Sequence, residues 1–424
     1  GRCYPVQKRF VSKLYEGVRN GTVSYDELRK SGDFIFNADV SSLYPASMRG
    51  VQMMSVAYPK GKSRWSDKPK EEFDNGTIGF YNIEFTCPDI RVPILPRRKL
   101  LNGRSIGVEW SLKPGRGVYS SVDIQNAIQY GYNVTFIDKC LAYDDSGDLF
   151  SKYVDKYYAL KTIAEKEGND VKKQIAKLML NALYGKTLQK AIFDTSKVIH
   201  NVNDYHDFLR KYELTGWNMI NGKQLILTGT CIDQEDKITK PAQLGAFVTA
   251  YSRRLMIFYM SIIDPTLKTP VFTYSDTDSL HILGKHYYKV LDAGYIKPKS
   301  APEIGYLSSD IKNEGLIINE INLAPKTYMY EYINNKNEVK CDDHATMKCK
   351  GIPTKHLQHE HYRNDEPVPI NMSGLKKKGM NLTKADKSND VHNFSVVAYE
   401  QTRTFNLTSW NQANFRDNQW YPEK

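Results

Sequence analysis

The segment VFTYSDTDSLHIL, residues 271–283, places two aspartates between two apolar runs. Val271–Tyr274 predicts a strand that enters a turn and Leu280–Leu283 predicts the returning strand, so the segment predicts a β-hairpin. Residues two apart on a strand share a face, and we therefore expect Asp276 and Asp278 to point the same way. No lysine or arginine flanks them, and two close like charges repel unless a cation neutralises them. The hairpin predicts a cation site, although an isolated D-x-D is also typical of a solvated turn.

A third carboxylate follows another short apolar run. Residues Phe34–Ala38 predict a buried strand, and Asp39 comes directly after it. A few hard oxygen ligands that leave room for phosphates and water suit Mg²⁺. Two such ions about 3.5–4 Å apart activate the attacking oxygen and stabilise the leaving oxygen in phosphoryl transfer. The alternative is that Asp39 caps the helical turn at Ser41–Met48.

Residues 151–185 contain no proline and show two helical patterns that flank a break at residues 167–170. Asn169 or Asp170 is the expected N-cap of the second helix, and Gly185 is its expected end. The stretch therefore predicts a helical hairpin.

One stripe of the second helix combines cationic, amide and phenolic side chains, because spacings of four and three place them on one face. These residues are Lys173, Lys177, Asn181 and Tyr184. Such a stripe could hold a triphosphate and stack on a base. The alternative is a solvated lysine face with a tyrosine at its end.

Composition favours a soluble globular protein with a polyanionic partner. Hydrophobic residues make up 41% of the 424 residues and charged residues 25%, and the formal net charge is +11. No apolar run is long enough to span a membrane, because Arg253 and Arg254 interrupt the best candidate, residues 244–263. We expect that segment to be a buried or groove-lining helix. Six widely spaced cysteines indicate a reduced, cytoplasmic setting in a host cell.

Four motifs occur in an order that resembles the family B DNA polymerases. Residues 39–45, DVSSLYP, resemble motif A; Lys177-x-x-x-Asn181-Ala-Leu-Tyr184-Gly185 resembles motif B; Tyr274–Ser279 resembles motif C, Y-x-D-T-D-S; and Lys326-Thr-Tyr328 resembles the K-x-Y element. Each motif has chance matches, but the four in this order are specific. The sequence DVSSLYPASM, residues 39–48, is most similar to that of the protein-primed branch found in phages, linear plasmids and adenoviruses.

The resemblance implies a catalytic metal site. Asp39 and Asp278 would be the principal ligands of two Mg²⁺ ions, with Mn²⁺ as a possible substitute. The Val40 carbonyl would contribute, and Asp276 would stand beside them. The implied enzyme is a DNA-directed DNA polymerase that adds dNTPs to a primer hydroxyl.

The resemblance also implies contacts with the nucleotide and the primer. Lys177 would hold the triphosphate, Lys161 would be a second phosphate contact, and Asn181 belongs to the same substrate-binding stripe. Tyr44 would exclude a ribose 2′-OH, while Tyr184 would pack at the nascent base pair. Lys326 and Tyr328 would contact the primer strand.

The implied fold is α+β, a right-hand polymerase with a palm of antiparallel sheet and helices, helical-hairpin fingers, a thumb and two insertions. The corresponding ranges are 1–50 and 241–354 for the palm, 51–150 for an insertion that would contact the terminal protein, 151–189 for the fingers, 190–240 for a second insertion and 355–424 for the thumb. The expected partners are primer-template DNA, dNTP and a terminal priming protein.

Two departures from the family pattern matter. Ala182 stands where the family has serine. Only 38 residues precede Asp39, so the family's exonuclease domain does not fit there, and we expect it as a missing domain or a separate chain. Two other functions stay open: a catalytically inactive relic that binds DNA or a partner, and a metal-dependent nuclease.

Overall fold

The computed structural model describes residues 3–5, 7–101, 104–189, 194–220, 224–232, 240–269, 271–341, 346–350, 352–363, 368–377, 396–405, 415–416 and 419–420. Much of the predicted thumb, 355–424, therefore lies outside the described residues. The chain divides into two compact units. The first comprises Gly1–Tyr184, Gln243–Val368 and Phe405–Lys424, and the second comprises Gly185–Ala242 and Pro369–Thr404.

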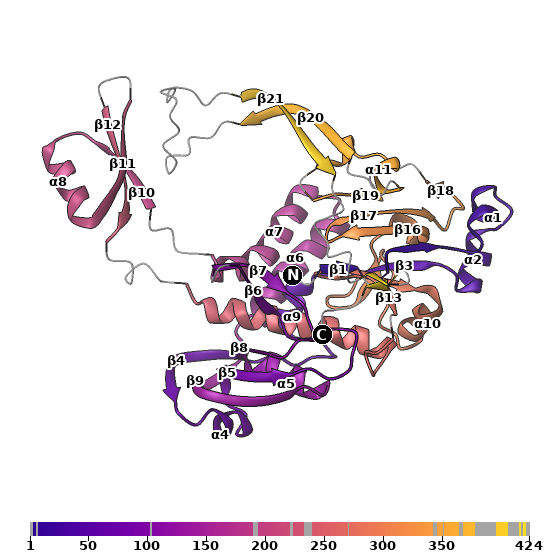
Figure 1. The fold of residues 1–424 in the computed structure, drawn as a ribbon, viewed down its shortest axis with the longest axis horizontal. Coiled ribbons are helices and arrows are strands. Elements are labelled where there is room, and N and C mark those ends of the chain that lie inside the picture. The colour runs from indigo at the N-terminus through magenta and orange to yellow at the C-terminus, as the bar shows by residue number, and fades with distance from the viewer. Residues whose placement is uncertain are drawn as a thin grey trace. The chain divides into compact units, whose positions relative to one another are not determined.

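An antiparallel sheet of ten strands forms the centre of the first unit (Figure 1). Its order is β1-β13-β14-β3-β16-β17-β18, with β15 paired to β3, β2 to β16 and β19 to β17. All nine residues of β16 are buried, which fits a strand covered on both faces. The strands are β1 Cys3–Pro5, β2 Arg9–Val11, β3 Ile35–Val40, β13 Phe272–Asp276, β14 Ser279–Leu283, β15 Leu307–Ser309, β16 Leu316–Ala324, β17 Thr327–Ile333, β18 Val339–Lys340 and β19 Met347–Lys348.

A second sheet lies within residues 51–150, the range predicted for the first insertion. Its order is β4-β9-β5-β8, and the separate hairpin β6–β7 lies between β5 and β8 in the chain. The elements are β4 Tyr58–Ser66, α4 Pro69–Asp74, β5 Ile78–Thr86, β6 Arg97–Leu101, β7 Arg104–Glu109, β8 Gly115–Ser120, α5 Ser121–Gln129 and β9 Asn133–Gly147.

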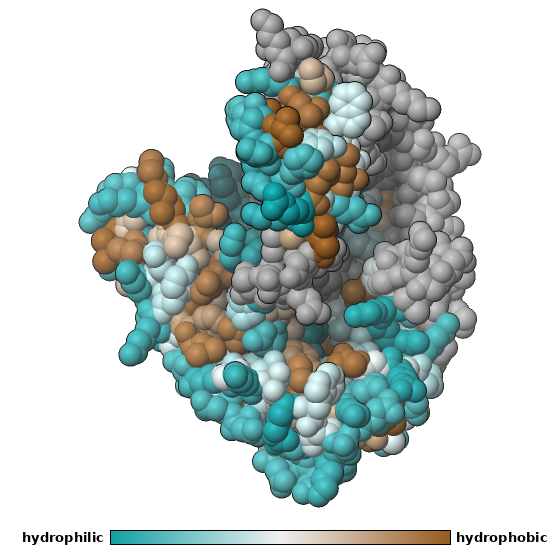
Figure 2. Space-filling view, turned by 90° about the vertical axis from the view of Figure 1, so that its left-hand side faces the viewer, coloured by the Kyte–Doolittle hydropathy of each residue, from teal (hydrophilic) through white to brown (hydrophobic). Residues whose placement is uncertain are grey.

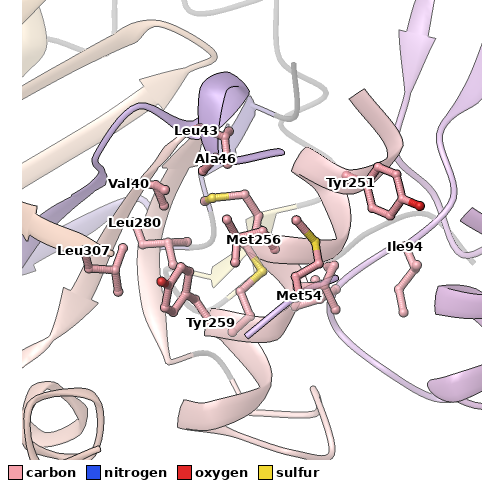
Figure 3. Packing of buried hydrophobic residues seen from close by; sticks show 14 of the residues in the cluster. Val40, Leu43, Ala46, Met54, Ile94, Tyr251, Met256, Tyr259, Leu280 and Leu307 are labelled. Carbon is pink, nitrogen blue, oxygen red and sulfur yellow. The ribbon is translucent and has the colours of Figure 1, made fainter. Parts of the chain in front are cut away.

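The long helix α9, Ala242–Ile263, lies between these two sheets (Figure 1). Toward the four-stranded sheet, its Phe247 ring packs edge-on against Phe80 with centroids 5.4 Å apart. Toward the ten-stranded sheet it packs on α3, Leu43–Arg49. Buried side chains from α9, α3 and both sheets share one core, including Val40, Leu43, Ala46, Met54, Ile94, Tyr251, Met256, Tyr259, Leu280 and Leu307 (Figure 3).

Arg253 explains why an apolar helix carries a charge. Its guanidinium donates Nε to Asp123 Oδ1 at 2.9 Å and Nη2 to Asp123 Oδ2 at 2.8 Å, so α9 is tied to α5. The expectation of a buried helix in this segment is confirmed. Across the described residues, no helix is both long and apolar enough to cross a membrane.

The helical hairpin consists of α6, Ser151–Lys166, and α7, Asp170–Thr187. Asn169 caps α7, because its Oδ1 accepts the Lys172 N–H at 3.0 Å. The predicted end at Gly185 is wrong by two residues. Gly185 does not adopt the positive φ with which glycine ends helices, so α7 continues past it.

Short elements complete the first unit. Helix α2 begins with a capping box, in which Ser24 Oγ accepts the Glu27 N–H and Glu27 accepts the Ser24 N–H. The short elements are α1 Tyr15–Arg19, α2 Tyr25–Ser31, α10 Gly284–Asp292, α11 Glu360–Arg363, the 3₁₀ turns Lys312–Glu314 and Thr354–His356, and the pair β22 Phe415–Arg416 and β23 Gln419–Trp420.

The described part of the second unit contains a three-stranded sheet with the order β10-β12-β11, and helix α8 packs against it. Phe208 of α8 is buried against Gly229 of the central strand, where a side chain would collide with its ring. The elements are β10 Asp194–Ile199, α8 Val202–Lys211, β11 Tyr212–Ile220, β12 Gln224–Cys231, and the pair β20 Val368–Lys377 and β21 Val396–Phe405.

Hydrophobic side chains also reach the surface of the molecule. Figure 2 shows several such patches among larger hydrophilic areas. The combination of antiparallel sheets with helices confirms the predicted α+β class.

Candidate active site

Asp39 occupies a fixed position in the middle of the ten-stranded sheet. It pairs with Ser279 of β14 on one side and with Ser308 of β15 on the other. The next residue, Val40, donates its backbone N–H to the Asp278 carbonyl at 2.8 Å. Asp39 is not a helix cap, because Ser42 is the N-cap of α3 and no side chain caps that helix. The capping alternative is therefore wrong.

The turn between β13 and β14 separates its two aspartates. Asp276 ends β13, whereas Asp278 lies in the turn and donates its N–H to the Asp276 carbonyl at 2.7 Å. Thr277 between them has a φ of 58°, in the left-handed region. Strand alternation does not apply across such a turn, so it does not support the expectation that the two side chains point the same way, and that expectation stays a prediction.

Asp276 has a cationic partner that its sequence neighbours do not reveal. Lys326 Nζ donates to Asp276 Oδ2 at 2.5 Å across 50 residues of sequence. The Lys326 backbone N–H also donates to the Tyr274 hydroxyl at 2.9 Å. The inference that no lysine or arginine pairs with these aspartates is therefore wrong for Asp276. The K-x-Y element and the motif C hairpin meet at this contact.

Asp39 and Asp278 form a pair with unfavourable electrostatics. Burial first, and then the neighbouring charge of Asp278, raise the pKa of Asp39 to about 8. Burial also raises the pKa of Asp278, and the charge of Asp276 adds to the effect. Two half-buried neighbouring carboxylates disfavour ionisation unless a cation lies between them.

Their donor chemistry fits Mg²⁺. This ion is usually held by one or two carboxylates together with substrate phosphates and water. Within the part of the chain that the structure describes, no cluster of three or more His, Cys, Asp or Glu side chains is placed to hold a metal by itself. A pair of carboxylates completed by phosphates is compatible with both observations. The role of the Val40 carbonyl stays a prediction.

Tyr44 and Tyr184 form an aromatic wall. Their rings stack with centroids 4.0 Å apart and planes at 22°. Tyr44 lies in the first turn of α3, shortly after Asp39, and Tyr184 lies near the end of α7. Burial raises the pKa of Tyr44, and the adjacent Tyr184 hydroxyl raises it further, so the phenol stays neutral. The structure therefore brings the predicted motif A and motif B tyrosines into contact.

The predicted phosphate-binding lysines cluster on the helical hairpin. Burial lowers the pKa of Lys161, and the charges of Lys177 and Lys173 lower it further, although Glu165 opposes the shift. Lys173 pairs with Glu165 at 2.6 Å. Lys177 is exposed and lowers the pKa of Asp39, as a cation facing the carboxylate does. Asn181 is also exposed.

Two charged residues near the carboxylates were missed by the sequence reasoning. The charge of Asp310 raises the pKa of both Asp39 and Asp278, whereas Lys299 lowers that of Asp39. Lys299 Nζ donates to the Asp310 carbonyl at 2.6 Å. Asp310 follows β15, whose pairing with β3 brings it to the site. The only local signal was an aspartate after a short strand, which is too common to single it out.

The arrangement can be compared with known proteins. The family model described as DNA polymerase type B, organellar and viral, matches residues 8–261, more than half of the chain. This chain belongs to that family of type B DNA polymerases. The predicted family B resemblance is thereby confirmed.

Named relatives come from fungi and phages. The chain is 28% identical over 343 residues to a DNA polymerase of Kluyveromyces lactis, covering 76% of this chain and 31% of that protein. It is 25% identical over 359 residues to the DNA polymerase of Bacillus phage phi29, covering 79% of this chain and 55% of that protein. The chain thus spans about a third to about half of the length of these two polymerases.

A solved structure has the same fold. It is the phi29 DNA polymerase complexed with primer-template DNA and incoming nucleotide substrates, with a TM-score of 0.56 and 18% identity. The match covers 96% of this chain and 60% of the phi29 polymerase chain. The right-hand type B polymerase fold predicted from the motifs is confirmed, while the domain boundaries and the roles of single residues stay predictions.

Proposed function

We propose that this chain catalyses template-directed DNA synthesis, adding dNTPs to a primer hydroxyl by two-metal phosphoryl transfer. The observation that carries the proposal is the pairing of Asp39 and Asp278 next to the Tyr44–Tyr184 stack. The family match and the presence of primer-template DNA and nucleotides in a related structure support it. The proposed partners are therefore primer-template DNA and dNTP.

Asp39 and Asp278, with the Val40 carbonyl, would hold the divalent ions. When bound, these ions lower the pKa of the attacking hydroxyl and stabilise the charge on the leaving oxygen. Mg²⁺ is the expected ion, and Mn²⁺ could replace it because it accepts the same ligands. Asp276 would act differently, because its pairing with Lys326 already satisfies its charge.

The cationic face of the helical hairpin would bind the triphosphate. Lys177 would hold the phosphates opposite Asp39, and Lys161 would add a second contact from α6. Asn181 is exposed on the same helix and would complete this surface. Because these groups bind a polyanion, they would align the α-phosphate with the primer hydroxyl and so lower the entropic part of the barrier.

The stacked tyrosines would select the nucleotide. The Tyr44 ring is held by Tyr184, so it cannot move aside easily to admit a 2′-OH. Tyr184 would pack against the nascent base pair from the other helix. This arrangement would favour dNTP over NTP.

The primer would meet the β16–β17 hairpin, whose turn carries Lys326 and whose strand β17 carries Tyr328. Tyr328 packs against Tyr274 with ring centroids 4.8 Å apart, which joins the proposed primer contact to the catalytic hairpin. We further propose that the hydroxyl can come from a terminal protein as well as from a DNA 3′ end, as in the protein-primed branch. The predicted exonuclease partner and the cytoplasmic host location stay predictions.

Primer extension tests the proposal. Asp278→Ala should abolish incorporation of labelled dNTP while the Kd for primer-template DNA stays within about threefold of wild type, because the phosphate contacts dominate DNA affinity. Asp138→Ala, at an exposed aspartate on β9, is the control and should keep activity.

Three outcomes would reject the assignment. Extension by the Asp278→Ala protein would show that the site lies elsewhere, and an inactive wild-type protein that binds DNA would favour the inactive relic. Degradation of labelled DNA with Mg²⁺ in the absence of dNTP would favour a nuclease.

A further inference from the structure

A carboxylate lies fully buried behind the proposed active site. Glu320 of β16 has no exposed surface. Its Oε2 accepts hydrogen bonds from Thr273 Oγ1 and from Asn322 Nδ2, the latter at 2.9 Å, and its Oε1 is hydrogen-bonded to His281 Nδ1. Both oxygens are satisfied, as a buried carboxyl group requires. None of these residues belongs to the motifs that identify the family.

The partners of Glu320 come from both arms of the catalytic hairpin. Thr273 lies on β13, three residues before Asp276, and His281 lies on β14, three residues after Asp278. Both side chains are buried, with exposed fractions of 0% and 1%. The Glu320 carboxylate therefore joins β13 to β14, three residues before Asp276 and three residues after Asp278.

Glu320 also belongs to the second hairpin of the proposed site. Strand β16 leads into the turn that contains Lys326, and Lys326 contacts Asp276 at the end of β13 and Tyr274 further down the same strand. The Tyr328 ring lies with its centroid 4.8 Å from that of Tyr274 and 5.7 Å from that of His281, so it packs against both arms of the catalytic hairpin. The two hairpins are thus joined at two levels, by Glu320 within the sheet and by Lys326 at the surface.

We propose that Glu320 is a positioning residue that fixes the distance between the aspartate-bearing hairpin β13–β14 and the lysine-bearing turn β16–β17. It does not touch substrate or metal. This inference rests on the proposed polymerase function, because the distance matters for the alignment of the primer hydroxyl with the dNTP. A displacement of about 1 Å at such a site lowers the rate by about 10²-fold.

The same sheet offers a matched control for a purely structural role. Glu331 of β17 is also buried, with 1% of its surface exposed. Its Oε2 accepts hydrogen bonds from the Tyr15 hydroxyl at 2.6 Å and from Asn319 Nδ2 at 2.7 Å. None of its described hydrogen-bond partners lies on β13 or β14. Glu320→Gln and Glu331→Gln therefore make the same chemical change at equal depth, but only the first alters the link between the hairpins.

The test compares kcat, the KM for dNTP and the Kd for primer-template DNA in the two variants. For Glu320→Gln we expect kcat to fall by about 10²-fold, with KM and Kd within about threefold of wild type. Glu331→Gln should keep kcat within about threefold of wild type. A kcat that Glu320→Gln lowers no more than Glu331→Gln does, or a loss confined to Kd, would overturn the proposal.

A milder pair of variants guards against misfolding. Thr273→Val removes one hydrogen bond to Glu320 at nearly constant volume and should lower kcat by about tenfold, whereas Thr273→Ser keeps the hydroxyl and should stay near wild type. Equal kcat for the two variants would contradict the role of this hydrogen bond.

Amide hydrogen exchange gives a readout that needs no activity. Faster exchange in residues 274–280 and 324–328 of Glu320→Gln, but not of Glu331→Gln, is the expected result. If the two variants show this pattern but the wild-type protein has no extension activity, only the proposed function is refuted. Unchanged exchange in an active protein would refute the positioning role alone.

Discussion

At the scale of single residues, backbone pairing places the two predicted metal-binding carboxylates, and ring stacking joins the two predicted tyrosines. Asp39 is fixed between β14 and β15, and its neighbour Val40 donates to the Asp278 carbonyl. Tyr44 follows five residues later at the start of α3, where it meets Tyr184. Only Ser41 and Ser42 separate β3 from α3, so the backbone holds the proposed sugar gate close to the proposed metal site.

Tyr44 gives the sharpest prediction at this scale. Tyr44→Val removes the ring that would collide with a ribose 2′-OH, so the preference for dNTP over NTP should fall by about 10²-fold, measured as the ratio of kcat/KM values. Tyr44→Phe is the matched control, because it keeps the ring and its stacking on Tyr184 and should keep the preference. Unchanged sugar selection in Tyr44→Val would remove the gate role.

Local pattern predicted much of the site but not its long-range pairings. The hairpin around Asp276 and Asp278 and the strand before Asp39 were predictable, because alternating or continuous apolar runs specify strands. The ion pair between Asp276 and Lys326 was not, since it joins residues 50 positions apart through the sheet topology. Asp310 was missed for the same reason. Such contacts depend on which strands pair, and periodicity does not determine this.

At the scale of secondary-structure elements, α7 presents two different faces. Ala176 and Leu180 are buried, whereas Lys177 is exposed and Lys173 pairs with Glu165 of α6. The predicted stripe of lysine, amide and phenol is therefore the outward face of a packed hairpin, and its last member turns inward onto Tyr44. The predicted end at Gly185 failed because a glycine ends a helix only where the chain needs a positive φ.

The stripe predicts that Lys177 and Lys172, which lie on the same helix, contribute differently to the KM for dNTP. Lys177→Ala should raise the KM for dNTP by about 10- to 100-fold, because a charge-assisted phosphate contact is worth about 1.5–3 kcal/mol. Lys172→Ala is the control: Lys172 pairs with Glu167 at 3.7 Å, near the loop between the helices. It should leave the KM within about twofold. Equal effects from the two changes, in steady-state extension assays, would mean that α7 contributes only general positive charge.

At the scale of the whole first unit, α9 packs between the ten-stranded and the four-stranded sheet, and the two sheets have different predicted roles. The ten-stranded sheet carries the carboxylates, and the four-stranded sheet forms most of the stretch predicted to contact a terminal protein. One hydrophobic core runs through both. The sequence predicted α9 as a buried helix but not its neighbours, because its apolar residues face almost every direction and carry no information about which partner each side meets.

The Asp123–Arg253 ion pair links α5 to α9 beside this core, and it yields the last prediction. Asp123 is 6% exposed and accepts two charge-assisted hydrogen bonds from Arg253. Asp123→Ala leaves the Arg253 guanidinium largely desolvated and without its carboxylate. Removing one member of a buried ion pair lowers the free energy of unfolding by about 3–5 kcal/mol. Because Arg253 is partly exposed, we expect a loss at or below the lower end of that range. We expect amide exchange of α5 and of residues 247–257 to accelerate, while α7, which does not depend on the pair, keeps its protection.

Lys70→Ala, which breaks an exposed pair with Asp74 in the same insertion, is the control and should change exchange only locally. Unaltered exchange in α9 of Asp123→Ala would show that apolar packing alone holds the two sheets together.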